Sequence, residues 1–154
     1  MTGSSYETGG LVGDNIGTIS SSYATGNVTG NNYTGGLVGY NDSGIITNSY
    51  STGNVTGSYN TGSLVGCNIG YSSLGTIYYA RISSSYSIQI SGLNSIGAQG
   101  SYSIVSGVYA KSSTELKKQS TFTGWDFTSV WAIDEGKSYP YLRANEQIPH
   151  PGTN

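Results

Sequence analysis

The sequence predicts an all-β fold: a β-solenoid, similar to a parallel β-helix, of about four coils, with a small aromatic-rich C-terminal cap that contains a short helix. Two nearly identical segments, Ser22-Tyr-Ala-Thr-Gly-Asn-Val-Thr-Gly30 and Ser49-Tyr-Ser-Thr-Gly-Asn-Val-Thr-Gly57, start 27 residues apart. A Leu-Val-Gly block recurs in step with them, beginning at Leu11, Leu37 and Leu64. A fixed period of this size indicates one small supersecondary unit that is stacked on copies of itself.

Each unit contains three short runs of β-favouring residues, which in the first unit are residues 11–12, 18–23 and 27–29. Gly and Asn separate these runs, and we expect them to provide the positive φ angles that sharp corners need. Three strands separated by corners form one coil of a solenoid. An array of β-hairpins is the alternative, but its usual Asn-Gly and Asp-Gly turns do not occur in the chain.

Alternation along each run predicts which side chains face the interior of the coil. We expect ladders of equivalent Leu, Ile and Val residues to stack inside, at about 4.8 Å per coil. These ladders are Leu11, Leu37 and Leu64; Ile19, Ile46 and Ile82; and Val28, Val55 and Ile90. A tyrosine ladder recurs in the same way and lies either inside or on the outside, as an aromatic strip. Its members are Tyr23, Tyr50 and Tyr86.

An asparagine follows each Leu-Val-Gly block at the same offset, at Asn15, Asn41 and Asn68. One interpretation is a row of polar ligands, or calcium sites completed by Asp14 and Asp42. The other is an asparagine ladder, in which side-chain amides hydrogen-bond successive coils. We favour the ladder, because calcium requires six to eight oxygen ligands and few carboxylates are present.

The third unit departs from the pattern. Residues 70–81 are an insertion before Ile82-Ser-Ser-Ser-Tyr86 resumes the repeat, and we expect the insertion to loop outward or to add an extra strand. Residues 93–107 follow as a shortened fourth unit. Terminal copies that drift in sequence are typical of solenoids.

The character of the chain changes after about residue 110, which divides it into a repeat solenoid (1–110), a capping region (111–145) and a tail or linker (146–154). A capping box from Ser112 to Glu115 predicts a short helix over 114–119. We expect strands at 122–127 and 130–133. The aromatic cluster here is either a carbohydrate platform or a plug over the end of the solenoid, and we favour the plug.

The Leu-Val-Gly blocks, each followed by Ser-Tyr and, in the first two units, by Thr-Gly-Asn-Val-Thr-Gly, resemble the GLUG-motif repeat family. Residues 113–127, 130–131 and 135–142 resemble the tail that follows such repeats. The resemblance covers most of residues 6–143. It implies a non-catalytic segment of a large secreted or cell-surface bacterial protein, of the haemagglutinin-like adhesin or IgA-peptidase type. The third unit departs from the family pattern at Ser63 and at the insertion.

Composition excludes several classes of partner. Charged residues form 9% of the chain, against about 25% in an average domain, and the net charge is −2. We therefore expect no nucleic-acid partner. No apolar run approaches the roughly 20 residues of a membrane span, so we expect no membrane insertion. Cys67 is the single cysteine, which rules out an intrachain disulfide.

Nothing in the sequence points to catalysis. The single histidine, His150, lies between two prolines, so neither a Ser-His-Asp arrangement nor a histidine-ligated zinc site is expected. Asp126, Asp134 and Glu135, near Lys137, are the best carboxylate set, and a charged turn explains them. We expect no enzyme activity, catalytic residue, cofactor or metal.

We therefore expect a structural or adhesive module, extracellular or on a bacterial cell surface, within a longer secreted chain. It would present a Tyr-, Thr- and Asn-rich face to a glycan, a protein or identical subunits. The alternatives are a self-assembling filament subunit and an ice- or glycan-binding solenoid. The candidate binding surface comprises Tyr23, Tyr50, Tyr86, Thr25, Thr52, Trp125 and Trp131.

Overall fold

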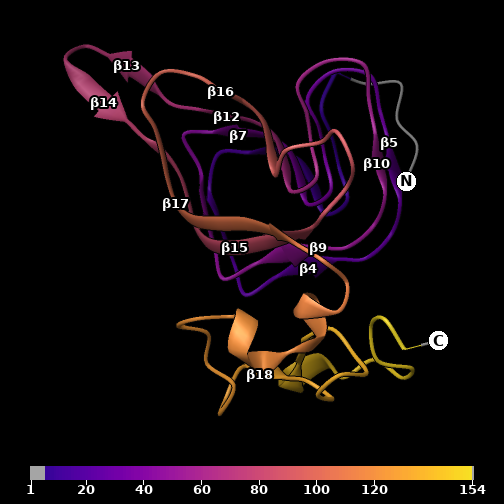
Figure 1. Ribbon diagram of the computed structural model, residues 1–154. Helices are drawn as coiled ribbons and strands as arrows, with labels where there is room; N and C mark the ends of the chain where they lie inside the picture. Colours follow the sequence, from indigo (N-terminus) through magenta and orange to yellow (C-terminus); the bar gives the residue numbers. More distant parts are fainter. Residues whose placement is uncertain (1–5, 154) are drawn as a thin grey trace. The chain divides into compact units, whose positions relative to one another are not determined.

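The computed structural model describes residues 6–153, and its contacts divide the chain into two compact units, Met1–Ala110 and Lys111–Asn154. The first unit is a β-solenoid of about four turns (Figure 1), which confirms the predicted fold class. The few residues of the expected domain ranges that fall at 1–5 and 154 lie outside the described residues.

One complete turn consists of five short strands. In the second turn these are β6 (Thr34–Gly35), β7 (Val38–Asp42), β8 (Ile45–Thr47), β9 (Tyr50–Ser51) and β10 (Val55–Thr56). Their first-turn equivalents are β1 (Thr8–Gly9), β2 (Val12–Asn15), β3 (Thr18–Ser20), β4 (Tyr23–Ala24) and β5 (Val28–Thr29). The third turn contains β11 (Thr61–Gly62), β12 (Val65–Ile69) and β15 (Ala80–Ile88), and the fourth contains β16 (Ile96–Gln99) and β17 (Ser103–Lys111).

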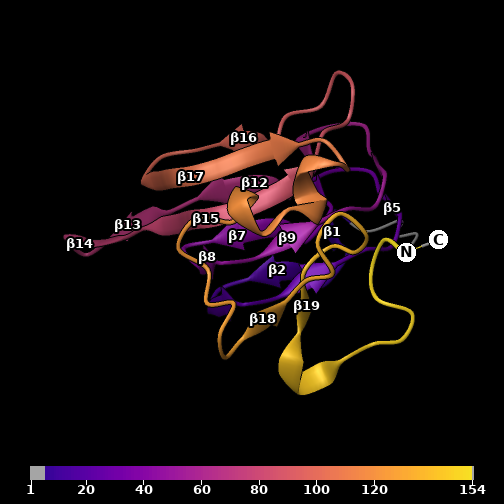
Figure 2. The same ribbon diagram turned by 60° about the horizontal axis from the view of Figure 1, so that its bottom comes forward.

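Equivalent strands of successive turns pair in parallel, as a solenoid requires. Ile19 pairs with Ile46 and Ile46 with Ile82, and Tyr50 pairs in the same way with Tyr23 and Tyr86. Figure 2 shows β2, β7, β12 and β16 following one another along the stack, in the order of their sheet. The alternative of a hairpin array is therefore wrong for the repeats.

The interior of the solenoid is an apolar cluster built from the predicted ladders. Its buried members are Ile19, Ala24, Leu37, Val38, Ile46, Leu64, Val65 and Ile82. Val28 and Val55 are also buried. Leu11 is a correction, because its side chain is 46% exposed. Its N–H donates to the Leu37 carbonyl at 2.9 Å, so it keeps the register, but it belongs to the first turn and has a neighbouring turn on one side.

The Val28–Val55 ladder does not extend to Ile90, as we had expected. Ile90 instead forms an antiparallel bridge with Leu93, inside the connection to the shortened fourth turn. Because this connection reverses direction, the strand that would follow β10 in the stack is not formed there. The apolar character of Ile90 could not show this from the sequence.

The corners use asparagine, as we expected, but serine takes the place that we expected glycine to fill. Serine and asparagine adopt positive φ at one equivalent corner of three turns, at Ser21, Asn48 and Ser84, with φ of 44°, 48° and 45°. The glycines inside the repeats serve close approach instead. A Cβ at Gly35 would lie 1.9 Å from the Val38 carbonyl oxygen. It would also lie 2.7 Å from the Gly66 backbone nitrogen of the next turn, so both the local corner and the stacked turn leave no room there for a side chain.

The asparagine row forms the predicted ladder. The Asn15 amide donates to Asn41 Oδ1 at 2.7 Å, and the Asn41 amide donates to Asn68 Oδ1 at 2.6 Å. The Asn68 amide continues to the hydroxyl of Ser103 at 2.6 Å. All three amides are buried, so these bonds satisfy polar groups that would otherwise be costly inside the protein.

The second unit holds η1 (Glu115–Lys117), η2 (Gln119–Thr121), β18 (Trp131–Ala132), β19 (Tyr141–Leu142) and η3 (Arg143–Asn145). The capping box is present: the Ser112 N–H donates to Glu115 at 2.9 Å, and the Glu115 N–H donates to the Ser112 hydroxyl at 3.2 Å. It opens a single 3-10 turn rather than the longer helix that we predicted.

Aromatic packing organises this unit. Residues 122–127 form turns and not the expected strand, because Phe122 and Trp125 fold toward each other with ring centroids 4.7 Å apart. Trp125 also contacts Trp131 of β18 at 4.6 Å. The segment 146–153 packs within the unit, unlike the tail or linker that we expected. Pro151 is buried, and its carbonyl accepts the Tyr139 N–H at 2.7 Å.

Candidate functional site

The insertion in the third turn forms a β-hairpin that projects from the solenoid (Figures 1 and 2). Strand β13 (Tyr71–Ser73) pairs antiparallel with β14 (Thr76–Tyr78). The two turn residues, Leu74 and Gly75, have φ of 50° and 80°. Positive φ at both positions is the signature of a type I′ turn, whose twist matches that of the flanking strands.

The base of the hairpin is held by the adjoining turns. The Gly70 N–H donates to the Ser101 carbonyl at 2.8 Å, and the Ala80 N–H donates to the Tyr102 carbonyl at 3.1 Å. On the other side, the Ser43 hydroxyl donates to the Tyr78 carbonyl at 3.4 Å. The hairpin therefore leaves a fixed point of the solenoid, where the second turn makes a short corner.

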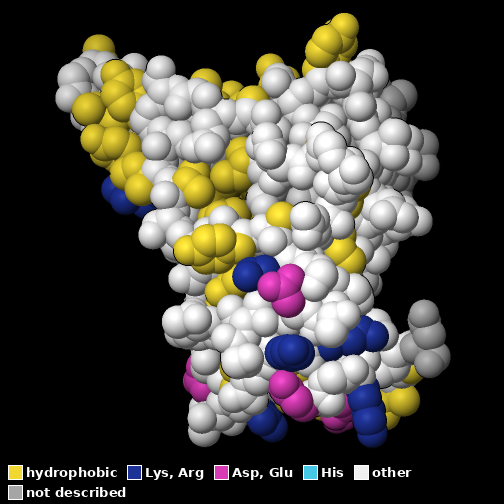
Figure 3. Space-filling model, viewed as in Figure 1, with side chains coloured by type: hydrophobic (Ala, Val, Ile, Leu, Met, Phe, Trp, Pro, Cys, Tyr) yellow, Lys and Arg dark blue, Asp and Glu magenta, His cyan; other side chains and the backbone are white. Residues whose placement is uncertain are grey.

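Large apolar side chains are concentrated on this hairpin, and all of residues 71–79 are exposed. The exposed large apolar residues of the segment are Tyr71, Leu74, Ile77, Tyr78 and Tyr79. Figure 3 shows hydrophobic side chains gathered over the hairpin. An exposed apolar patch of this kind, in a chain otherwise rich in Gly, Ser and Thr, is a candidate recognition surface.

The tyrosine rings of the hairpin are held in place by contacts with other tyrosine rings. Tyr71 and Tyr78 face each other across the two strands, and their rings stack with centroids 4.8 Å apart at 23°. Tyr79 packs edge-on against Tyr102 of the fourth turn at 6.2 Å. Such contacts stabilise a particular ring orientation before any ligand arrives.

Arg81 adds a positive charge at the base of the hairpin. Its guanidinium carbon lies 5.1 Å from the centre of the Tyr79 ring, a cation–π contact. It is the single Lys or Arg among residues 1–110. Within residues 6–153 its side chain is exposed and forms no ion pair.

The surface predicted from the sequence is largely buried. Tyr23 is half-buried and stacks on Tyr50 at 5.2 Å, whereas Tyr50 and Tyr86 are 0% and 3% exposed. Thr25 is exposed and Thr52 is half-buried. Trp125 and Trp131 are buried in the aromatic cluster of the second unit. The structure therefore brings the tyrosine ladder together but leaves accessible mainly Tyr23 and the threonines.

Another ladder collects titratable groups. Asp14, Tyr40 and Cys67 are paired in register on β2, β7 and β12. Burial, with the neighbouring thiol and carboxylates adding to it, raises the pKa of Tyr40 to about 12. Burial also raises the pKa of the Cys67 thiol. The thiol is therefore protonated at neutral pH, whereas a nucleophilic or metal-binding cysteine acts as the thiolate.

The carboxylates of the second unit are engaged in local structure. Asp126 accepts the backbone N–H groups of Thr128 and Ser129 at 2.8 and 2.9 Å, which lowers its pKa. Glu135 accepts the Gln119 N–H at 3.0 Å. Residues 6–153 contain no group of three or more His, Cys, Asp or Glu side chains that could hold a metal ion.

His150 is held by carboxylates on both sides. Its Nδ1 bonds Asp134, and its Nε2 bonds Glu146 at 3.0 Å. The ring stacks on Tyr141, with centroids 3.9 Å apart. Hydrogen bonds to the two carboxylates raise the pKa of His150, Asp134 contributing most. Glu146 lies four residues before His150 in the sequence, whereas Asp134 lies 16 residues before it and is brought to the ring by folding.

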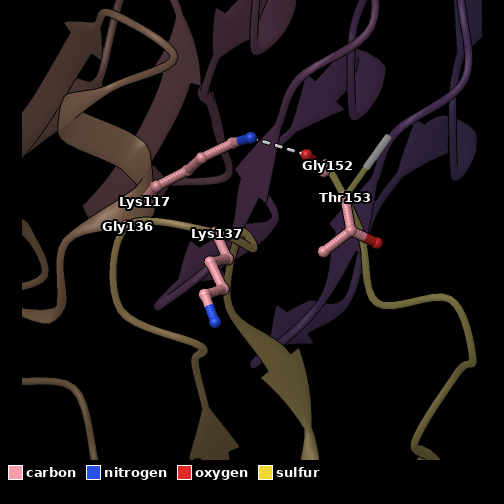
Figure 4. A pocket seen from close by; sticks show the side chains of 5 residues that line it. All are labelled: Lys117, Gly136, Lys137, Gly152 and Thr153. Carbon is pink, nitrogen blue, oxygen red and sulfur yellow. Dashed lines mark hydrogen bonds between the residues drawn. The ribbon is translucent and has the colours of Figure 1, made fainter.

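Two lysines border a shallow pocket of the same unit, together with Gly136, Gly152 and Thr153 (Figure 4). Lys117 donates to the Gly152 carbonyl at 2.6 Å, and its ammonium lies 5.4 Å from the centre of the Tyr139 ring. Lys137 points away from that bond. With one lysine committed to the backbone, the pocket has no pair of converging cations.

Comparison with protein families gives a match within the solenoid: residues 30–56 match the family described as the GLUG motif. The chain carries a GLUG repeat. The GLUG segment coincides with one complete turn of the solenoid, from just before β6 to the end of β10. Neither the comparison with curated proteins nor the comparison with solved structures gives a match.

The hairpin lies in the third turn, which directly follows the matched GLUG segment, and it is an addition to the regular repeat. Ile46 and Ile82 are 36 residues apart, against 27 for Ile19 and Ile46. In the GLUG turn, Ser43 and Gly44 form the corner between β7 and β8, and the hairpin replaces this corner in the next turn. Within the described residues, no helix has the length and apolar character needed to cross a bilayer.

The sequence interpretation identified the insertion but did not treat it as a site. The available signal was its composition, since three tyrosines, a leucine and an isoleucine occur between residues 71 and 79 outside the repeat pattern. Apolar residues that fall out of phase with a solenoid have no interior position to occupy.

Proposed function

We propose that the chain is a non-catalytic adhesive repeat module of a bacterial cell-surface or secreted protein. The observation that carries the proposal is the exposed tyrosine hairpin, β13–β14, inserted into an otherwise regular GLUG solenoid. The stacked turns supply a rigid support, and the hairpin supplies the contact surface. The GLUG match and the low charge of the chain are consistent with this division of roles.

A variant that restores the regular corner tests the adhesive role. Ile69 pairs with Asp42 and Arg81 pairs with Ile45, so residues 70–80 can be replaced by Ser-Gly, the corner of the GLUG turn. We expect the parent chain to bind components of an array of glycans and extracellular-matrix proteins, and the shortened variant to lose that binding. Tyr59→Ala removes an exposed tyrosine outside the hairpin and is the matched control.

Circular dichroism should show the same β-sheet signal for all three proteins. If the parent chain binds nothing on the array, the adhesive proposal is wrong. If the shortened variant binds as well as the parent, the module is adhesive through another surface. Protease treatment of intact cells that produce the protein tests the surface location, since an exposed module is removed while cytoplasmic proteins remain.

The absence of catalysis belongs to the same proposal. The carboxylates of the second unit are occupied by backbone N–H groups or by His150, and the Cys67 thiol is protonated. We expect no turnover of polysaccharides or peptides by the chain. Turnover that is abolished by Asp126→Asn, Asp134→Asn or Glu135→Gln would overturn this expectation.

Self-association is the second candidate function. Strands β2 and β16 are the two edges of the four-stranded sheet in the order β16-β12-β7-β2. Unpaired parallel strands can receive the matching edge of another copy, and head-to-tail pairing of this kind gives open filaments. Analytical ultracentrifugation over a range of protein concentrations tests it, because a filament subunit must show mass that increases with concentration.

A further inference from the structure

We infer that the β13–β14 hairpin binds a sugar ring that carries a carboxylate, such as a uronic or sialic acid residue of a glycan. Tyr79 would contact this ring and Arg81 would bind its carboxylate, while the stacked pair Tyr71 and Tyr78 would contact a neighbouring ring of the same glycan. The inference rests on the proposed adhesive function and adds the chemical class of ligand.

The tyrosines provide the apolar part of the site. A pyranose ring has a face of C–H groups that packs against an aromatic face, while its hydroxyls bond polar neighbours. Tyr71 and Tyr78 are stacked on one another, and Tyr79 is held against Tyr102. Because these rings are already ordered, binding a ligand requires little loss of side-chain freedom.

Polar groups surround the rings. Ser72, Ser73 and Thr76 lie on the hairpin strands and are exposed, and each tyrosine adds a phenolic hydroxyl. A purely apolar ligand would leave these groups without water or partners, which is unfavourable. A ligand with several hydroxyls can satisfy them, and this favours a carbohydrate over a lipid chain.

Arg81 selects for negative charge. A guanidinium presents a planar fork of N–H donors that matches a carboxylate, and charge-assisted bonds of this kind are stronger than neutral ones. Its contact with the Tyr79 ring fixes the guanidinium beside that tyrosine, at the base of the hairpin. Its position is notable because the other basic residues of the chain all lie at position 111 or later.

The size of the surface favours a sugar over a folded protein. Each hairpin strand has three residues, so the paired region is about 10 Å long. A stable protein interface takes roughly 800 Å² and about 20–30 residues from each partner. The hairpin offers nine exposed residues, enough for one or two sugar rings.

Calorimetric titration with matched acidic and neutral sugars tests the inference. Trigalacturonic acid and its methyl ester form one pair, and 3′-sialyllactose and lactose form the other. We expect the acidic member of at least one pair to bind about ten- to a hundred-fold more tightly than its neutral counterpart, which is the effect of one charge-assisted contact. The pair that responds distinguishes a uronic acid from a sialic acid.

Four variants locate the site. Arg81→Gln should abolish the preference for the acidic sugar, and Arg81→Lys should retain only part of it, because lysine lacks the planar fork. Tyr78→Ala should weaken binding of both members of the pair. Tyr59→Ala, at an exposed tyrosine outside the hairpin, should bind as the parent does.

Three results would overturn the inference: equal binding of acidic and neutral sugars, no binding of either, or an acidic preference that survives Arg81→Gln. Binding of a Glu- and Tyr-containing peptide at the hairpin, with no sugar bound, would assign the surface to a protein partner. In that case, hairpin-dependent binding to the array of glycans and matrix proteins would still support an adhesive module. The sugar inference can therefore be wrong while the adhesive function is right.

Discussion

At the scale of single residues, the effect of a substitution depends on how closely the adjacent turn of the solenoid approaches that position. Gly26 and Gly53 occupy the same position of the repeated Thr-Gly-Asn-Val-Thr segment, yet their surroundings differ. A Cβ at Gly53 would lie 2.0 Å from the Gly26 carbonyl oxygen, whereas a Cβ at Gly26 would meet nothing within 4 Å. Sequence identity therefore hides two different steric environments.

This pair gives a direct prediction. Gly53→Ala should lower the free energy of unfolding by about 1–3 kcal/mol, because the backbone of the adjacent turn must move to admit the methyl group. Gly26→Ala should change it by at most about 0.5 kcal/mol. Urea denaturation of the two variants measures the difference, and equal midpoints would contradict the steric assignment.

The leucine ladder gives a second matched pair. Leu37 is fully buried and Leu11 is 46% exposed, although both begin a Leu-Val-Gly block. Leu37→Ala should destabilise the protein by about 2–5 kcal/mol, since it leaves a cavity in a central turn. Leu11→Ala should have a clearly smaller effect. Thermal melts of the two variants decide the matter: similar losses would show that the first turn is packed as tightly as the second.

At the scale of elements, side-chain hydrogen bonds hold strands and turns in place where few apolar side chains are buried. The asparagine ladder ties β2, β7 and β12 together across three turns. In the second unit, the box between Ser112 and Glu115 satisfies N–H groups at the start of η1. The bonds from Ser112, then Lys111, lower the pKa of Glu115 from 4.5 to about 2.

The sign of this shift sets the pH dependence of the cap. Because the folded-state pKa lies below the ordinary value, ionised Glu115 stabilises the cap above about pH 4.5, and the contribution is lost as the pH falls through about 2. NMR titration of the Glu115 carboxyl should give a midpoint near 2. Ser112→Ala should move the midpoint toward 4.5, while the neighbouring Ser113→Ala should leave it in place.

At the scale of the whole molecule, the solenoid is a row of turns in which each turn depends on its neighbours. Strand β16 ends the order β16-β12-β7-β2, and Ile96 and Val108 are partly buried against the apolar cluster of the interior. The open end of such a stack exposes apolar side chains and unpaired backbone groups, which promote association. From the sequence we predict that the aromatic C-terminal region caps this end.

Truncation tests that prediction. A chain ending at Lys111 keeps all of β17 and lacks the second unit. We expect it to form oligomers or aggregates that static light scattering detects, while the complete chain remains monomeric under the same conditions. A truncated chain that stays monomeric and melts at the same temperature as the complete chain would show that the C-terminal region is not a cap.

The sequence by itself determined the period, the ladders and the parallel architecture. These follow from sequence because every copy repeats the same spacing, so a residue such as Ile46 must pair with Ile19 and Ile82 once the turns stack. The asparagine ladder is predictable for the same reason. The capping box is a local pattern and needs no distant partner.

Only the tertiary structure decided how exposed each copy is and what the insertion does. Leu11 and Leu37 are equivalent in sequence but differ in burial, since burial depends on the turns on either side. The tyrosine ladder gave no indication that Tyr50 and Tyr86 would be buried while Tyr71 and Tyr78 were presented outside. A hairpin that occurs in one turn has no second copy to reveal its register, and its rings, with Arg81, come together only when the chain folds.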